Sequence, residues 1–290
     1  MASSNKQTKA ERQQTAREKA RQMQEEQRRQ ERRRSLMVRW GVVTAVVVVI
    51  AVVVGIIFMN SSRSIPDAGP APSAANDQGG ITLTSTTELA PGDEAFTEVD
   101  NADASQPEMT GEAPTSVPGG EARPAGEPVQ IIVYADANCV HCASFEQENA
   151  GQMAEWLDAG EATVEYRMLD YLDNPATGNY SSRAGNALAC MAEQSPEHYN
   201  SFMTEIFASY ATKQGEGLSD DELKEMASGL GAEINGCIDG NEYRPFVTHT
   251  GTAAREAQIA GTPSVWVQGE NWDQSTPFAE YVEGKIAEQS

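Results

Sequence analysis

Cys139-Val140-His141-Cys142 stands at the junction of two segments whose patterns differ. Before it runs the apolar hexapeptide VQIIVY, residues 129–134, which predicts a buried strand. After it, residues 143–157 predict a helix. Thiol-disulfide chemistry needs a Cys-x-x-Cys pair at the first turn of a helix, because two intervening residues bring the sulfurs within bonding distance.

The position of each cysteine on that helix suggests a different task. The N-terminus of a helix presents unpaired N–H groups and a positive dipole end, which favour a thiolate at the first cysteine. Cys139 is therefore the candidate nucleophile, and Cys142, one turn further, is placed to resolve a mixed disulfide. His141 could add a hydrogen bond and, when protonated, a positive charge that stabilises the thiolate.

Two other interpretations of the pair are a plain structural disulfide and half of a zinc site. A structural zinc site wants four ligands, usually as a second closely spaced pair. Cys190 and Cys237 are 47 positions apart, and neither His198 nor His249 lies in a Cys/His cluster. The sequence therefore favours a redox centre, and we expect no metal and no cofactor.

Charge is unevenly distributed along the 290 residues. Residues 1–39 hold twelve Lys and Arg against five Asp and Glu, a net charge of +7, whereas the rest of the chain has nine against 38, or −29. The basic arm, residues 1–40, contains too few apolar residues to build a core. A solvated tail near anionic lipid explains it better than nucleic-acid binding, because no aromatic residues are interleaved with the charges.

Residues 41–59, GVVTAVVVVIAVVVGIIFM, carry no charge. As a helix they would span about 28 Å, which matches the hydrocarbon core of a bilayer. The basic flank before this segment places the N-terminus in the cytoplasm and everything after Met59 outside it. We expect an uncleaved single-pass anchor; the alternative is a cleaved signal peptide, but no small-x-small site follows the apolar segment directly.

Residues 60–128 contain nine of the fourteen prolines, twelve acidic residues against two basic ones, and a single aromatic residue, Phe96. Such a composition predicts a disordered linker. From Val129 onward, aromatic residues and regular periodicities return, and residues 129–290 are long enough for one domain with a sizeable core.

Within that domain, a strand over residues 163–169 completes a right-handed parallel strand-helix-strand unit. The later periodicities predict helices over 182–193, 196–210, 219 to about 230 and 245 to about 260, a strand over 264–267, a hairpin turn over 268–271, and a helix opened by Pro277. Ser219 and Glu222 have the spacing of a capping box.

This α/β order resembles the thioredoxin fold with an inserted helical domain, residues 176–258, and specifically the DsbA family of disulfide oxidoreductases. The resemblance covers about Val129–Ser290 and rests on Cys139-Val140-His141-Cys142 and on Ile259-Ala260-Gly261-Thr262-Pro263. It implies that Thr262 and a cis Pro263 face the cysteines and form a substrate-binding loop; taken alone, these residues would be an ordinary turn before a strand.

Two positions depart from the pattern of the family. Val140 occupies a position where the family commonly has proline, and Val133 occupies one where enteric members carry a buried acid. Asp136 could replace that acid, or could serve as a turn or capping carboxylate.

Cys190 and Cys237 remain outside the motif. Thiols oxidise and persist as disulfides outside the cytoplasm, and similar second disulfides occur in actinobacterial members of the family. We expect a structural Cys190–Cys237 bond, with two free buried thiols as the alternative.

The expected function is thus a membrane-tethered, extracytoplasmic oxidoreductase that introduces disulfides into exported protein clients. The family implies a membrane reoxidising partner of the DsbB or vitamin K epoxide reductase type. Two alternatives stay open: an isomerase or reductase of the same fold, since the direction depends on reduction potential, and a non-catalytic envelope adaptor.

Overall fold

The strand before the Cys-x-x-Cys motif, β5 (Val129–Ala135), lies inside a six-stranded sheet whose order is β3-β2-β6-β5-β7-β8. It runs parallel to β6 (Ala162–Met168), to which α2 (Val140–Asp158) connects it. On its other side it pairs antiparallel with β7 (Ser264–Val267). The predicted strand-helix-strand unit is therefore confirmed, as is the later return of the chain to the sheet.

The computed structural model describes residues 65–104 and 107–289, which belong to a compact unit that begins at Ile65. The remaining strands are β1 (Ala68–Pro70), β2 (Gly80–Ser85), β3 (Glu88–Leu89), β4 (Glu98–Asp100) and β8 (Glu270–Asn271). The remaining helices are α3 (Tyr180–Gln194), α4 (Tyr199–Lys213), α5 (Asp220–Gly229), α6 (Asn235–Gly240), α7 (Arg244–Glu256) and α8 (Phe278–Gln289), with 3-10 turns at Pro175–Thr177 and Pro196–His198.

Both faces of β5 are buried. Ile131 and Val133 point into the main core, whereas Ile132 and Tyr134 point into a second, smaller cluster on the opposite face. Successive side chains of a strand alternate between faces. A strand covered on both sides needs apolar residues at every position, which explains the unbroken run in the sequence.

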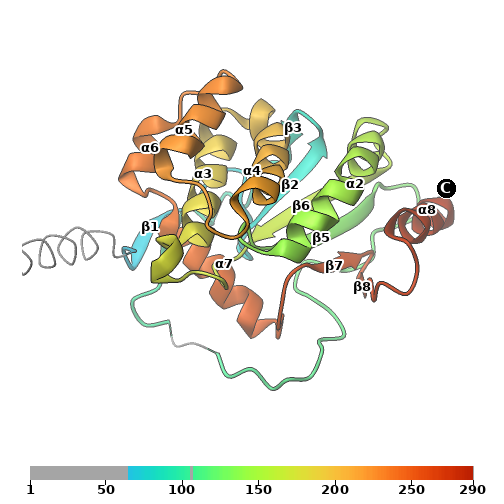
Figure 1. Ribbon diagram of the computed structural model, residues 1–290. Coiled ribbons are helices and arrows are strands. Elements are labelled where there is room, and N and C mark those ends of the chain that lie inside the picture. The colour runs from blue at the N-terminus through green and yellow to red at the C-terminus, as the bar shows by residue number, and fades with distance from the viewer. Residues whose placement is uncertain (1–64, 105–106, 290) are drawn as a thin grey trace, which may run out of the picture. The chain divides into compact units, whose positions relative to one another are not determined.

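The predicted helical insertion is confirmed: α3 to α7 all lie in the chain between β6 and β7. Figure 1 shows α3 to α6 gathered at one side of the sheet, while α2 runs across its face. The predicted capping box also forms, with Ser219 and Glu222 at the start of α5. Its acidic first turn complements the positive end of the helix dipole.

The disordered linker expected over residues 60–128 is wrong for its first half, where four strands form between Ala68 and Asp100. Strand β2 pairs antiparallel with β6, from Gly80 opposite Arg167 to Leu83 opposite Val164. Strands β1 and β4 form a small antiparallel sheet of their own. The folded unit therefore begins near Ile65, well before the boundary expected at Val129.

The linker was predicted from the amino-acid composition averaged over residues 60–128, and such an average hides short strands. The apolar residues of β2 alternate, so that Ile81 and Leu83 are both buried in the main core. Residues 107–128, which precede β5, form an extended loop that passes α7 (Figure 1). Two side chains hold its end: Arg167 donates to the Pro118 carbonyl at 2.8 Å, and Gln130 donates to the Gly119 carbonyl at 2.8 Å.

The basic arm at 1–40 and the membrane-spanning segment expected at 41–59 lie outside the described residues. Within residues 65–104 and 107–289, we find no helix of the length and apolar character that crossing a membrane requires.

Candidate active site

The two cysteines of the motif lie where the sheet passes into α2. Cys139 is the N-cap residue of that helix, and its backbone N–H donates to the Asp136 carbonyl at 3.0 Å, which closes the turn after β5. Both cysteines are free thiols. Cys139 is 6% exposed and Cys142 is 1% exposed, so an incoming sulfur can reach the first more readily than the second.

Cys139 favours the thiolate form. The hydrogen bond from the Cys142 thiol is the largest cause that lowers the pKa of Cys139, to about 5, and burial opposes it. The Thr262 side chain and the backbone N–H groups of Cys142 and His141 lower the pKa further. The Thr262 carbonyl, 3.3 Å from Cys139 Sγ, can instead accept from the protonated thiol. The donors prevail, so Cys139 is ionised at neutral pH.

Cys142 has the opposite tendency. Burial is the largest cause that raises its pKa, and the neighbouring Cys139 sulfur raises it further. Cys142 therefore remains a protonated thiol that donates to the Cys139 thiolate. This asymmetry fits the nucleophile and resolving roles inferred for the two cysteines from the sequence.

The side chain of His141 is exposed. Its backbone N–H, rather than its imidazole, contributes to the low pKa of Cys139. Among the hydrogen bonds of the described residues, none joins the imidazole to either sulfur. The structure thus places His141 beside the nucleophile without the side-chain contact that the sequence suggested.

The expected substrate-binding loop faces the nucleophile. The Thr262–Pro263 peptide bond is cis, as the resemblance implied. Thr262 lines a cavity of about 670 Å³ that contains Cys139 and is walled by Val140 and Leu172, whose side chains are exposed. Pro263 lines a second cavity of about 400 Å³ on the other side of His141. An extended chain that reaches Cys139 would therefore pass this loop.

Asp136 is a buried turn carboxylate beneath the site. Its Oδ1 accepts from Ser181 Oγ at 2.7 Å and from the Asn138 N–H at 2.8 Å, and its Oδ2 accepts from the Leu172 N–H at 2.9 Å. Burial raises the pKa of Asp136 to about 6. The side chain ties together the turn before Cys139, the loop after β6 and the start of α3.

Glu146 is a buried acid that the sequence analysis missed. It lies on α2 four residues after Cys142, and therefore on the same face of the helix. Its Oε1 accepts from the Tyr166 hydroxyl at 2.9 Å, and burial raises its pKa to about 7. A carboxyl with this pKa changes its protonation state near neutral pH. The signal was an acid next to Phe145 on the apolar face of the predicted helix.

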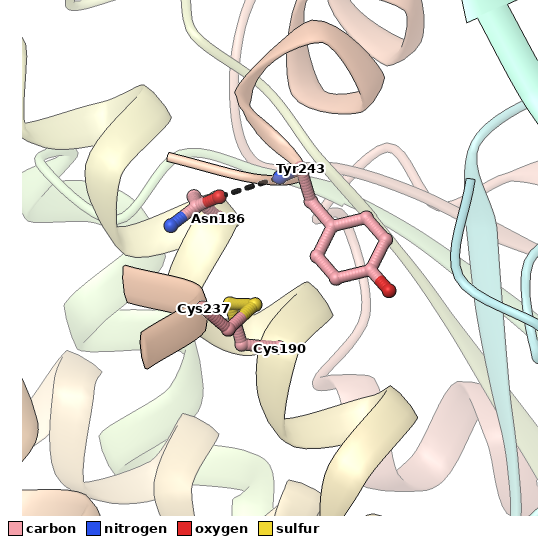
Figure 2. Close-up of a disulfide and its surroundings, with 4 residues drawn as sticks. All are labelled: Asn186, Cys190, Cys237 and Tyr243. Atoms are coloured by element: carbon pink, nitrogen blue, oxygen red, sulfur yellow. Dashed lines mark hydrogen bonds between the residues drawn. A yellow bond between two sulfur atoms is a disulfide. The ribbon is translucent and has the colours of Figure 1, made fainter. Parts of the chain in front are cut away.

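The second cysteine pair lies elsewhere. Cys190 on α3 and Cys237 on α6 form the expected disulfide, with their Cα atoms 5.9 Å apart (Figure 2). Nearby, Asn186 Oδ1 accepts from the Tyr243 N–H at 2.7 Å, which also joins α3 to the chain that follows α6. This disulfide fastens the helical insertion and contributes no atom to the site at Cys139.

The described part of the chain contains no cluster of three His, Cys, Asp or Glu side chains that could hold a metal ion.

Comparison with solved structures gives matches at low sequence identity. DsbA from Mycobacterium tuberculosis, reduced, is 24% identical; the match covers 61% of this chain and 92% of that chain, with a TM-score of 0.50. MdbA, a thiol-disulfide oxidoreductase from Corynebacterium diphtheriae, is 19% identical; the match covers 65% of this chain and 98% of that chain, with a TM-score of 0.48. MdbA from Actinomyces oris is 22% identical; the match covers 55% of this chain and 82% of that chain, with a TM-score of 0.49.

Comparison at the level of sequence gives a clearer result. No curated protein matches the chain. A family model described as thioredoxin matches residues 125–283, which is more than half of the chain. The motif at Cys139, the cis Pro263 and the parallel unit around α2 all fall inside that match. The chain belongs to the thioredoxin family.

Proposed function

We propose that this chain is a membrane-tethered, extracytoplasmic thiol-disulfide oxidoreductase that introduces disulfides into exported proteins. The asymmetry of the two thiols carries the proposal. Cys139 has a pKa of about 5 and borders an open cavity, whereas burial raises the pKa of Cys142 and keeps it a thiol. A reactive sulfur beside a protected one is what a dithiol that exchanges with protein substrates needs.

The reaction starts from the oxidised Cys139–Cys142 pair. A client thiolate attacks Cys139 Sγ, which forms a mixed disulfide and breaks the Cys139–Cys142 bond, and Cys142 leaves as a thiolate that takes up a proton. A second client thiolate then attacks the client sulfur of the mixed disulfide, and Cys139 leaves as a thiolate. The client loses two electrons and two thiol protons and gains a disulfide, while the enzyme pair is reduced.

The low pKa of Cys139 favours the oxidising direction. A disulfide is a strong oxidant when its reduced form is stabilised, and a stable thiolate stabilises the reduced form. Equilibration with glutathione would measure the reduction potential of the pair. A potential near that of DsbA, about −120 mV, supports an oxidase, and one near that of thioredoxin, about −270 mV, indicates a reductase instead.

The location rests on two features of the chain. Residues 41–59 are uncharged and follow a basic flank, which favours an anchor with a cytoplasmic N-terminus. The Cys190–Cys237 disulfide is typical of proteins outside the cytoplasm. We expect the full chain to require detergent for extraction and the domain to be digested by protease added outside intact cells. Extraction by salt alone would contradict the anchor.

Continuous turnover needs a partner that reoxidises the pair. A tether keeps the enzyme in the same membrane as a quinone-linked protein of the DsbB or vitamin K epoxide reductase type, which is the partner we propose. Reoxidation of the full chain should then require membranes that contain quinone.

Trapping tests the exchange itself. In cells, Cys142→Ala should accumulate mixed disulfides between Cys139 and exported proteins, because the Cys139 thiolate can still attack a client disulfide while no Cys142 thiol remains to displace the client from Cys139. Cys139→Ala should accumulate none, because Cys142 is buried. Equal trapping by both variants would contradict the assignment of the nucleophile, and no trapping by either would favour the adaptor.

A further inference from the structure

The cavity beside Cys139 has one wall that comes from outside the thioredoxin-like domain. Met109 lines this cavity together with Cys139, Val140 and Leu172. It belongs to the loop between β4 and β5, whereas the family match begins at residue 125. A segment that precedes the family's domain thus contributes a side chain to the cavity that holds the nucleophile.

A single side chain clamps this segment in place. The Thr110 backbone N–H and the Thr110 hydroxyl donate to Gln258 Oε1 at 2.7 and 2.8 Å. Gln258 Nε2 in turn donates to the Glu108 carbonyl at 3.2 Å. Met109 lies between the two clamped residues, so the clamp sets where its side chain points. Gln258 directly precedes the Ile259–Pro263 motif, which joins the clamp to the loop that faces Cys139.

Three large apolar side chains of the cavity wall are exposed. Val140, Leu172 and Met109 are 47%, 42% and 37% exposed, and they are the large apolar side chains that the described residues leave exposed. All three line this one cavity. Exposed apolar side chains gathered at one place mark a binding surface.

The reaction fixes what enters the cavity. A client cysteine must place its sulfur against Cys139, and an extended chain advances about 3.3–3.6 Å per residue. The residues on either side of the client cysteine therefore come to rest within the cavity walls. Another part of the cavity wall is cross-linked: the Tyr171 hydroxyl donates to the Ile259 carbonyl at 2.9 Å, and the Arg255 guanidinium lies 4.4 Å from the centre of the Tyr171 ring.

We propose that Met109 is a specificity-determining residue that selects clients with an apolar residue next to the reacting cysteine, and that Gln258 is the positioning residue that holds it. The proposal rests on the function proposed above. A methionine suits this task because its flexible thioether can pack against apolar side chains of different shapes.

The test measures mixed-disulfide formation by the oxidised full chain in detergent. The probes are single-cysteine peptides with leucine or serine on either side of the cysteine. The parent should react faster with the leucine peptides. Met109→Ala should lower the leucine-to-serine ratio of rate constants about fivefold, because one apolar wall is lost. Met109→Leu should keep the ratio.

Gln258→Asn tests the clamp. Asparagine is tolerated at the backbone φ of 60° that Gln258 adopts, but its side chain is one methylene too short to reach the segment. This variant should lower the ratio as Met109→Ala does. Asp158→Ala is the matched control, because Asp158 Oδ1 accepts from the Thr86 N–H and hydroxyl in the same way, at the far end of α2. It should leave the ratio unchanged.

The outcomes separate the two proposals. A parent that forms no mixed disulfide with any peptide overturns the proposed function. A parent that reacts, with the same ratio in Met109→Ala, overturns the role of Met109 alone. Equal acceleration of all peptides by Met109→Ala also overturns it, because Met109 would then be an obstruction. A changed reduction potential in Met109→Ala would show that its effect is structural and would overturn selection.

Discussion

Cys139 and Cys142 occur in the same helical turn, yet they favour opposite protonation states. The difference comes from what each sulfur touches. Cys139 receives hydrogen bonds from a thiol and from backbone N–H groups, whereas Cys142 is enclosed by the core. The same contact acts in both directions: the Cys142 hydrogen bond lowers the pKa of Cys139, and the Cys139 sulfur raises the pKa of Cys142.

This contact predicts how the site responds to substitution. Cys142→Ala removes the largest donor and should raise the pKa of Cys139 from about 5 toward that of a free thiol, about 8.5. His141→Ser keeps the backbone N–H and should shift the pKa far less. Ultraviolet absorbance of the thiolate against pH measures both. A larger shift in His141→Ser than in Cys142→Ala would restore the imidazole as the main stabiliser.

Glu146 gives a second prediction, about stability. Burial raises its pKa from 4.5 to about 7, so the folded protein favours the protonated form. The stability that this group contributes is complete below about pH 4.5 and is lost as pH rises through 7. Glu146→Gln should therefore unfold at a higher temperature than the parent at pH 8, with the difference shrinking toward pH 4.5. A constant difference across that range would contradict this assignment.

The residues of the site differ in how visible they are in the sequence. Cys139 and Cys142 could be predicted from their own identity and local spacing, whereas the role of Pro263 could be predicted only through the resemblance to the DsbA family. The position of Glu146 on the apolar face of the helix was a signal that the sequence analysis missed, whereas its hydrogen-bond partner Tyr166, twenty positions away, has no local signal. The role of His141 was overstated because a sequence cannot show which way an exposed side chain points.

Among the secondary-structure elements, β2 is one that local sequence patterns did not predict. Strand β5 and the helical insertion could be predicted, since each has an apolar pattern strong enough to stand alone. Strand β2 has two buried apolar positions, Ile81 and Leu83, within a segment rich in proline and acid. On one side it pairs with the neighbouring β3, but on the other it pairs with β6, and no pattern in the local sequence indicates that distant partner.

Adjacent positions on β2 test whether it belongs to the core. Leu83 is 0% exposed, and Leu83→Ala should lower the free energy of unfolding by about 3 kcal/mol. Thr84, the next residue, faces solvent, and Thr84→Ala should change stability by less than about 1 kcal/mol. Chemical denaturation measures both. Equal and small effects would mean that the segment is a linker after all.

At the scale of the whole molecule, the dominant feature is charge. Residues 65–290 hold 38 acidic and eight basic residues, a net charge of −30. Seven of the eight cations already pair with a carboxylate; they are Arg167, Arg183, Lys213, Lys224, Arg244, Arg255 and Lys285. The surface therefore presents excess negative charge, while the cavity at Cys139 is lined by no acid.

This separation predicts that charge governs the approach of a client, whereas the apolar cavity governs its fit. A field of one sign accelerates the association of oppositely charged partners by ten- to a thousandfold at low salt, and screening removes the effect. Oxidation of a cysteine peptide flanked by lysines should therefore be at least about tenfold faster than that of its glutamate counterpart in dilute buffer. The two rates should converge as ionic strength rises, since the Debye length shortens to about 3 Å at 1 M salt. Dithiothreitol is the control: like both peptides it attacks as a thiolate but carries no flanking charge, so its salt dependence measures the contribution of the attacking sulfur alone. If the lysine and glutamate peptides react alike at every ionic strength, the acidic surface has no part in choosing clients.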